Sequence, residues 1–310
     1  MKLTTACSPH IRGSFKTSRL MLDVCLALLP ALAVGIWRFG TSAVLLTLVC
    51  LAAAAATEYL CGLLLYKRNT LPDCSCFVTG FLLAMTLPAA TPLWQAAIGV
   101  FFAVFVVKGL FGGLGQNVFN PALTGRALLM LLWPLSVTRF AVDGVAGATP
   151  LHHMVMPALP EESLLDMFLG NCSGSMGEIS ALALLLGGVY LVVRKVISAR
   201  IPLAYIGAVA VLTLVFPKTE NAFLWMGYEL FSGGLMLGAI FMATDYATSP
   251  VTAGGQVIYG IGCGVLTVLF RYFGIYPEGV TYAILLMNAC VWVIDRLTPP
   301  RRFGTKGGKA

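Results

Sequence analysis

Charged side chains are scarce in this 310-residue sequence. Asp, Glu, Lys and Arg together make up 11% of it, whereas hydrophobic residues make up 58%. A soluble domain carries about 25% charged residues, so this chain has too few of them to cover a globular surface facing water. Apolar runs near 20 residues recur along the sequence, which is the length that a bilayer-spanning helix requires. The composition excludes an ordinary soluble domain and predicts a polytopic membrane protein.

A cleavable signal pattern and a convincing metal-ligand cluster are also missing. The N-terminal segment is polar and basic, and the first apolar run is too long for a signal peptide and is followed by others. Cys74 and Cys76 form a Cys-x-Cys pair, but no further Cys or His nearby completes a ligand set. His152 and His153 are adjacent, so they point in different directions, and we interpret them as surface residues. Cys172 stands alone in a long polar loop.

Ten apolar runs, five on each side of that loop, account for most of the chain. They occupy residues 20–37, 41–65, 77–87, 93–111, 122–137, 178–196, 201–216, 223–243, 257–273 and 280–297. We therefore predict an all-α polytopic membrane protein of about ten transmembrane helices. Its predicted parts are an N-terminal segment (1–19), a first five-helix repeat (20–137), a loop (138–177), a second five-helix repeat (178–297) and a basic tail (298–310).

The third run of each half is defective. Residues 77–87 are too few to cross about 30 Å of hydrocarbon as one helix, and residues 223–243 are interrupted by Glu229 and by Ser232-Gly233-Gly234. Short or broken segments are tolerated only where they are buried in protein or line a cavity. Residues 79–88 resemble residues 233–242, and five spans per half make the second copy enter from the opposite face. We expect two inverted repeats.

Cationic residues predict the orientation of the chain in the membrane. If the ten runs alternate in direction, one side of the membrane receives Lys2, Arg12, Lys16, Arg19, Lys67, Arg68, Arg194, Lys195, Arg200, Arg296, Arg301, Arg302, Lys306 and Lys309. The other side receives only Arg38, Arg139, Lys218 and Arg271. Both termini are therefore predicted to be cytoplasmic, and the loop 138–177 extracytoplasmic. We interpret the net charge of +7 through this topology and not as a sign of nucleic-acid binding.

A short polar island, residues 143–151, lies in the longest segment that could not itself lie in a bilayer. Three small residues at 146–148 leave the backbone beside Thr149 bare, so a bulky group can approach its hydroxyl. Pro150 prevents this segment from continuing as a helix. Such a stretch is ordinarily just a turn. The functional interpretation is a hydroxyl presented on an irregular loop next to the membrane.

A glycine- and asparagine-rich stretch, residues 108–122, joins the fourth and fifth runs. Gly112 and Gly113 allow close backbone packing, and Asn117 and Asn120 add amide donors and acceptors. One interpretation is a tight turn between packed helices. The other is a wall for a planar ligand with polar edges, such as a flavin ring, and the residues by themselves leave both open.

The corresponding stretch of the second half, residues 241–250, contains a carboxylate at the end of the broken run. Asp245, next to Thr244, is predicted either to line a cation route or to lie in an interfacial turn. Asp23 and Glu58, inside the first two runs, are candidates of the same kind.

Four stretches together are similar to a known family. They are Ser8-Pro9-His10-Ile11-Arg12 with residues 21–24 and 27–30, and residues 112–122, 143–151 and 242–250. The sequence resembles the D subunits of the Rnf ion-translocating electron-transport complexes, which are related to the B subunits of the sodium-pumping NADH:quinone oxidoreductases. The length of 310 residues suits the Rnf subunit better than its longer relative.

The resemblance implies that Thr149 carries FMN through a phosphoester bond, which a flavin transferase makes with FAD as donor. Asp143 matches the upstream aspartate of the family motif, and Gly147 and Ala148 match its small residues. Ala146 stands where the family usually has serine. A second, non-covalent flavin, riboflavin, occurs in the related subunit, and residues 112–120 are one candidate contact for it here.

The resemblance further implies a subunit of a ferredoxin:NAD⁺ oxidoreductase in the bacterial cytoplasmic (inner) membrane, which does not turn over alone. Electrons from reduced ferredoxin would pass through iron–sulfur membrane subunits and the FMN of the G subunit to the FMN on this chain, while Na⁺ or H⁺ moves outward. The implied partners are the A, B, C, E and G subunits, the flavin transferase and membrane lipid, with no nucleic acid.

A passive channel or small-solute transporter without flavin is the alternative function. Composition and periodicity alone favour it, because inverted five-helix repeats with broken spans suit solute permeation. The four matched stretches favour the redox subunit. The sequence leaves open which cation moves, whether a second flavin binds, and what Cys74 and Cys76 do.

Overall fold

Helices dominate the computed structural model, which describes residues 16–67, 69–138, 140–142, 145–147, 151, 154, 160, 162–274 and 279–299. The first half contains α1 (Thr17–Phe39), α2 (Thr41–Cys61) continued by the π-helix η1 (Gly62–Tyr66), the 3₁₀ turn η2 (Leu71–Asp73), α3 (Ser75–Thr86), α4 (Leu93–Phe101) continued by the π-helix η3 (Phe102–Gly109), α5 (Pro121–Leu132) and α6 (Pro134–Val137). The second half contains α9 (Ala181–Val193), α10 (Arg200–Val215), α11 (Ala222–Phe231), α12 (Leu235–Leu237) continued by the π-helix η4 (Gly238–Met242), α13 (Ala253–Phe273) and α14 (Val280–Leu297).

The lengths of these helices confirm the prediction of a polytopic membrane protein with short and broken spans. In the described part of the chain, four helices are long and apolar enough to cross a bilayer, namely Thr17–Phe39, Thr41–Tyr66, Ala253–Phe273 and Val280–Leu297. Five further apolar helices have 10–17 residues. Helix α3, with 12 residues, is about 18 Å long and cannot cross alone.

The break in the second half falls where the sequence predicts it. Helix α11 and the α12–η4 segment are bent by 64° relative to each other. Ser232 leaves the helical conformation, and Gly233 has φ = 63°, a left-handed backbone conformation that suits glycine. Residues 235–243 are all buried, and so are residues 79–87 around the short α3. Both defective segments therefore lie inside the protein, as the membrane environment requires.

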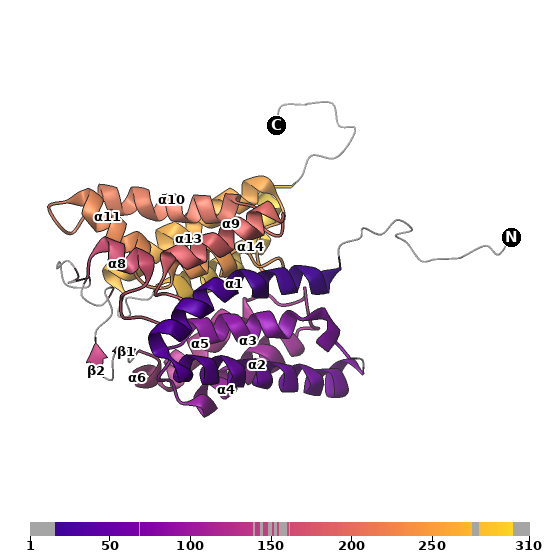
Figure 1. Cartoon of the computed structure of the whole chain (residues 1–310). Helices are drawn as coiled ribbons and strands as arrows, with labels where there is room; N and C mark the ends of the chain where they lie inside the picture. The colour runs from indigo at the N-terminus through magenta and orange to yellow at the C-terminus, as the bar shows by residue number, and fades with distance from the viewer. Residues whose placement is uncertain are drawn as a thin grey trace, which may run out of the picture.

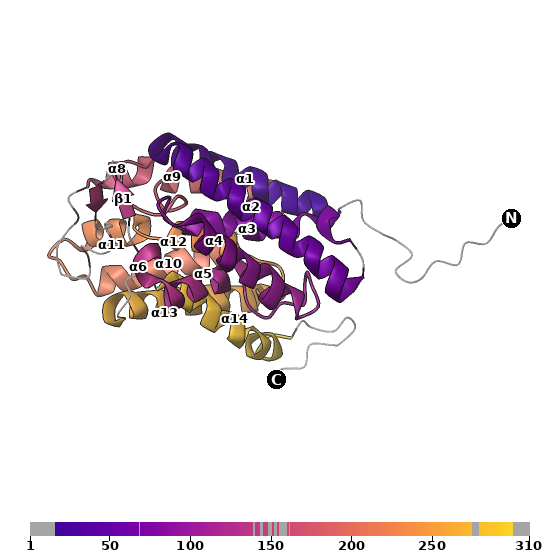
Figure 2. The same ribbon diagram turned by 90° about the horizontal axis from the view of Figure 1, so that it is seen from below.

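The two halves pack side by side and repeat the same neighbour relations. In Figure 1 the first half (indigo to purple) lies below the second half (pink to yellow), with α1 and α9 packed together between them. Helix α2 packs against α4 and η3 as α10 packs against α13, and α5 packs against α4 as α14 packs against α13. Helices α5 and α14 also pack against each other across the halves. Figure 2 shows α5 and α12 between the α1–α2 pair and the α13–α14 pair.

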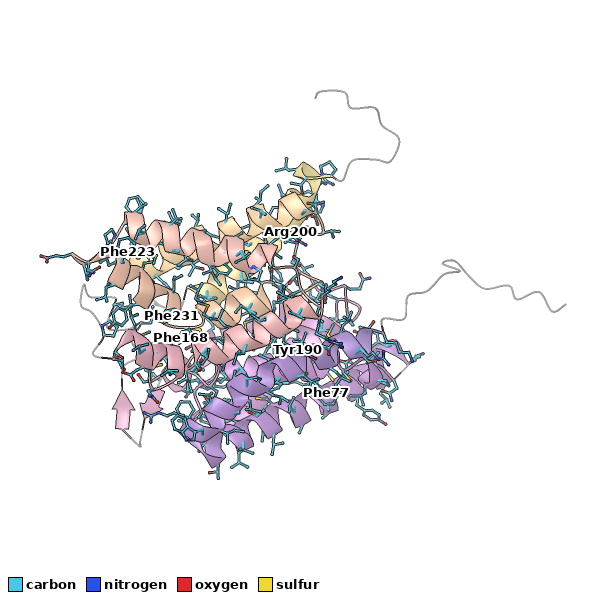
Figure 3. All side chains as sticks on the ribbon, turned by 45° about the horizontal axis from the view of Figure 1, so that its top comes forward. Phe77, Phe168, Tyr190, Arg200, Phe223 and Phe231 are labelled. Atoms are coloured by element: carbon cyan, nitrogen blue, oxygen red, sulfur yellow. The ribbon has the colours of Figure 1, made fainter. Side chains whose placement is uncertain are left out.

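The bundle has two distinct ends. Helix α1 begins and α14 finishes at the same end, which we call the tail end (Figure 1). The opposite end, which we call the hairpin end, carries the strands β1 (Phe140–Val142) and β2 (Val145–Gly147) and the short helix α8 (Leu164–Leu169). Figure 3 shows Phe168 and Phe231 at this end, where their rings meet edge to face with centroids 5.5 Å apart.

Two described stretches of the loop between the halves form a short hairpin. Strands β1 and β2 pair antiparallel, with Ala141 opposite Ala146. Each strand has only three residues, too few to show a period-2 pattern, so the sequence carries no signal for this hairpin. Ser163 caps α8 by accepting a hydrogen bond from the N–H of Asp166.

Close approach of backbones holds the junction of the halves together. A Cβ on Gly187 of α9 would collide with the backbone carbonyl oxygen of Ala27 in α1. Only glycine at this position lets the two helices approach as they do, as is common in membrane helix packing.

Candidate functional site

A cavity of about 70 Å³ opens toward the tail end, between the two halves. It has room for several water molecules. Its walls come from α1, α3, α5, α9, the π-helices η3 and η4, and the loops that follow them. The polar residues among its lining are Ser75, Thr79, Lys108, Asn117, Asn120, Thr244, Asp245 and Tyr246. The cavity therefore brings together the two polar stretches that the sequence places in different halves.

A buried ion pair forms one wall of this cavity. Lys108, at the end of η3, donates from Nζ to Glu58 Oε2 at 2.9 Å and to Ser75 Oγ at 2.6 Å. The side chains of Lys108 and Glu58 are only 4% and 2% exposed. Thr70 donates from its hydroxyl to the second oxygen, Glu58 Oε1, at 2.7 Å. Both charges are thereby paired, as low-dielectric surroundings demand.

Asp245 supplies a carboxylate at the same cavity. It lies three residues beyond η4 and accepts a hydrogen bond from the Thr248 hydroxyl at 3.2 Å. The neighbouring Thr244 is buried and donates to the carbonyl of Ile240 at 2.6 Å. Lys108 is already paired with Glu58, which does not line the cavity, so Asp245 is the carboxylate of the cavity that has no cationic partner in the described part of the chain. A carboxylate in such a position is a candidate ligand for a cation.

All three π-helical segments in the described part of the chain end near this cavity. Lys108 belongs to η3, and Thr244 follows η4. Tyr66, the last residue of η1, donates from its hydroxyl to the carbonyl of Gly109 at 2.6 Å. Because π-helical turns are rare and are frequent at functional sites, this clustering makes the tail-end cavity the candidate functional site of the bundle.

A much smaller cavity lies toward the hairpin end. Its volume of about 10 Å³ suits a single water molecule. Two buried ion pairs surround it, Arg126–Glu178 at 3.4 Å and Arg271–Glu229 at 2.7 Å. Arg271 ends the fourth helix of its half as Lys108 ends the fourth helix of the other. The cations at the two cavities thus occupy corresponding positions in the two halves.

The predicted attachment site lies mostly outside the described residues. Asp143, Ala148, Thr149 and Pro150 fall in the segments of the loop that the structure does not describe. Gly147 is the last residue of β2. Beyond the attachment position, the side chain of Leu151 is buried against Gly233, at the break between α11 and α12. The chain therefore enters and leaves the attachment segment at the hairpin end.

The glycine–asparagine stretch forms a turn whose amides are already engaged. Gly112 and Gly113 have φ of 111° and 98°, which explains why glycine stands there. Asn120 caps α5 by accepting from two backbone N–H groups, and it donates to the carbonyl of Met242 at 3.1 Å. Asn117 donates to the carbonyl of Phe119. Both amides therefore donate to carbonyls of the protein's own backbone, as in a turn between packed helices.

Asp23, the third predicted member of an ion route, lies elsewhere. It does not line the cavity, although Met21 and Val24 do. Its carboxylate accepts hydrogen bonds from the Tyr190 hydroxyl at 2.9 Å and from Arg194 at 3.2 Å. Tyr190 reaches it from α9, beside α1 (Figure 3). Asp23 therefore joins the two halves at the tail end.

The cysteines do not form a metal site in the described part of the chain. No group of three or more His, Cys, Asp or Glu side chains lies close enough there to hold an ion. Cys172 is buried in the loop before α9, and burial raises the pKa of its thiol to about 12. Cys172 is therefore a protonated, poorly reactive thiol.

The sequence interpretation missed four charged residues of the cavity walls: Lys108, Arg126, Glu178 and Arg271. Lys108 and Arg126 stand within or beside apolar runs, where an ionisable side chain is by default a candidate for function. The sequence therefore contained a signal for these two residues. It contained no signal for the pairing of the charges, because the paired residues are between 42 and 52 positions apart.

Comparisons with known proteins agree with the resemblance seen in the sequence. A sequence-family model described as the NQR2, RnfD, RnfE family matches residues 4–304. The chain is 46% identical to the D subunit of the Na⁺-translocating ferredoxin:NAD⁺ oxidoreductase complex of Acetobacterium woodii, over 98% of this chain and 96% of that protein. It is 43% identical to the D subunit of the proton-translocating ferredoxin:NAD⁺ oxidoreductase complex of Clostridium ljungdahlii, with the same coverage.

A third relative extends the comparison to a further bacterium. The D subunit of the ion-translocating oxidoreductase complex of Stutzerimonas stutzeri is 40% identical over 95% of this chain and 93% of its own length. The names of these relatives differ in the ion, since one is described as sodium-translocating and another as proton-translocating. Similarity to them therefore identifies no particular cation for this chain.

Proposed function

Because the chain belongs to the NQR2, RnfD, RnfE family, we propose that it is the D subunit of an Rnf complex, a ferredoxin:NAD⁺ oxidoreductase that couples electron transfer to cation translocation. The relatives named above cover almost its whole length. The observation that carries the ion-coupling part is the tail-end cavity, which the carboxylate of Asp245 lines while Lys108 is paired with Glu58.

The orientation is part of the proposal. The tail end lies on the cytoplasmic side, because most cationic residues of the sequence are expected there. The cavity bearing Asp245 then faces the cytoplasm, and the small cavity between the two arginine pairs lies in the extracytoplasmic half. The hairpin and the attachment segment face away from the cytoplasm.

We propose Thr149 as the residue that carries FMN through a phosphoester bond. Its small neighbours at positions 146–148 support this, because they leave room around the hydroxyl. Gly147 and the buried Leu151, the described residues on either side, lie at the hairpin end, which supports attachment at that end of the bundle. FMN, when bound, would supply one- and two-electron redox chemistry.

Replacement of Thr149 tests the attachment. The chain is coexpressed with the flavin transferase, and the peptide 143–151 is analysed by mass spectrometry for the added mass of an esterified FMN. Thr149→Ala is expected to abolish the modification and the flavin fluorescence of the band on a denaturing gel. An unmodified wild-type peptide would contradict the proposal, and solute flux through liposomes containing the lone chain would then favour the transporter alternative.

Asp245→Asn tests the ion route separately. The variant removes the carboxylate of the tail-end cavity but leaves the hairpin end untouched. Assayed in the whole complex in liposomes, it is expected to reduce ion uptake per electron transferred about tenfold or more, with the flavin content unchanged, since an amide does not hold a cation as a carboxylate does. Asp23→Asn is the matched control, because Asp23 lies outside the cavity. Unchanged ion uptake in the Asp245 variant would remove this residue from the route.

A further inference from the structure

A third concave site lies on the outer surface of α2, at the tail end. It is a groove of about 320 Å³ lined by Tyr59, Gly62, Leu63, Lys67 and Asn69. The first three residues belong to the end of α2 and to η1, and the last two follow η1. The groove is separate from the cavity that contains Asp245, because the two share no lining residue.

The backbone builds this groove by turning back on itself. Lys67 adopts φ = 51°, a left-handed conformation that is uncommon for a residue other than glycine, and its N–H closes η1 on the carbonyl of Gly62. The chain then returns beside α2, where the Thr70 hydroxyl donates to Glu58 at 2.7 Å. The helix end forms one wall of the groove and the returning turn forms the other, so both walls are fixed to the bundle.

The polar groups at the groove are hydrogen-bond donors. Tyr59 contributes a hydroxyl, Lys67 an ammonium and Asn69 an amide N–H₂. The oxygen of the Asn69 amide already accepts from the N–H of Leu71 at 3.1 Å. Within the described ranges, none of the three donors has a protein acceptor, and no carboxylate lines the groove. A site with a cation and neutral donors but no carboxylate selects an anion.

The rest of the groove is apolar and faces outward. Leu63 is 61% exposed and Tyr59 is 59% exposed, and the neighbouring Leu64 and Leu60 also face outward. On a membrane protein this apolar surface lies against acyl chains, and tyrosine is typical of the interface between hydrocarbon and water. The groove thus offers donors above an apolar strip, which matches a phosphate headgroup above its acyl chains.

We propose that this groove binds one anionic phospholipid, with the headgroup phosphate against Lys67 Nζ and the Asn69 amide and an acyl chain along Leu63. The site is distinct from the redox and ion-coupling role described above. It lies at the end of the bundle where cationic residues concentrate. These cations attract anionic lipids to the adjoining leaflet. Because the turn that carries Lys67 also holds Thr70 on Glu58, the lipid stabilises the wall of the tail-end cavity from outside.

Native mass spectrometry of the full-length chain, released from its complex in nanodiscs of equal parts phosphatidylglycerol and phosphatidylcholine, tests the proposal. The wild-type chain is expected to retain one phosphatidylglycerol preferentially. Lys67→Gln is expected to weaken retention about fivefold, the effect of one interfacial cation, and Lys67→Gln with Asn69→Ala to abolish it. Addition of inorganic phosphate at millimolar concentration is expected to leave the lipid bound, since the acyl chain contributes to its affinity.

Lys195→Gln is the matched control. Lys195 is also an exposed lysine with a left-handed backbone, φ = 58°, and it follows α9 at the same end, but it does not line the groove. Loss of lipid in the Lys67 variant with retention in the Lys195 variant supports the site. Three results would overturn it: equal retention of both lipids by the wild-type chain, equal loss of phosphatidylglycerol in both lysine variants, or displacement of the lipid by inorganic phosphate.

Discussion

Replacement of Lys108 by methionine is expected to destabilise the chain strongly. The change leaves the Glu58 carboxylate, which is 2% exposed, with the Thr70 hydroxyl but without its cation. Removing one partner of a buried ion pair costs about 3–5 kcal/mol, because the remaining charge stays buried and uncompensated. Glu58→Met is expected to cost a similar amount, since it strands the Lys108 ammonium with only the Ser75 hydroxyl.

The double replacement, Lys108→Met with Glu58→Met, is expected to be more stable than either single variant. Both charges then leave the interior together, and exchange of a buried pair for apolar residues of similar size is often neutral. The thermal midpoint of the detergent-solubilised chain, followed by size-exclusion chromatography, measures the effect. A loss of about 3–5 kcal/mol corresponds to roughly 5–8 °C in a protein of 310 residues.

A half-exposed ion pair at the same end provides the control. Arg194 pairs with Asp23 at 3.2 Å, but its side chain is 54% exposed. Arg194→Met is therefore expected to lower the thermal midpoint much less than Lys108→Met, because water reaches Arg194 and Asp23 keeps the hydrogen bond from the Tyr190 hydroxyl. Two results would refute the assignment of a buried and coupled pair. One is a thermal midpoint of either single variant within about two degrees of wild type, and the other is a loss of stability in the double variant that equals the sum of the two single losses.

Two further predictions concern packing and thiol chemistry. Gly187→Ala is expected to lower the free energy of unfolding by about 1–3 kcal/mol, since its new methyl group meets the backbone of α1. Gly207→Ala is the control and should be neutral or slightly stabilising, because nothing lies within 4 Å of the position of its methyl group. Equal thermal midpoints of the two variants would contradict the α1–α9 contact. Cys172 is expected to resist N-ethylmaleimide at pH 7–9, because its pKa of about 12 keeps the thiolate scarce until the pH approaches that value. Mass spectrometry of the native and SDS-denatured chain measures this difference, and fast labelling of the native chain would contradict the burial.

The order and type of the main elements follow from the sequence alone. Long apolar runs form helices because a chain in lipid must satisfy its backbone hydrogen bonds internally. The break at Ser232-Gly233-Gly234 and the short third helix of the first half are both visible as local composition, and the structure has them where they are predicted. Asn120 and Pro121 likewise mark the beginning of α5 locally.

Only some of the residues that line the tail-end cavity can be predicted from the sequence. Asp245 and Thr244 were identified because a carboxylate at the end of a broken apolar run is costly, and both do line the cavity. Asp23 looked equivalent in the sequence, yet Tyr190 and Arg194 bind it at the junction of the halves. The amides of Asn117 and Asn120 looked available for a ligand, but the cap of α5 and neighbouring carbonyls engage them. The attachment position Thr149 lies outside the described residues and stays a prediction.

Local composition was therefore enough to predict a bundle of apolar helices with one defective span in each half. Which buried charges meet depends instead on how the helices pack, because a helix records its own exposed and buried faces in its periodicity but not the identity of its neighbour. Lys108 reaches Glu58 and Arg271 reaches Glu229 through packing that joins residues more than 40 positions apart. The chemistry of both cavities depends on those non-local pairings, since the free energy of a buried charge is set by the partner that packing brings to it.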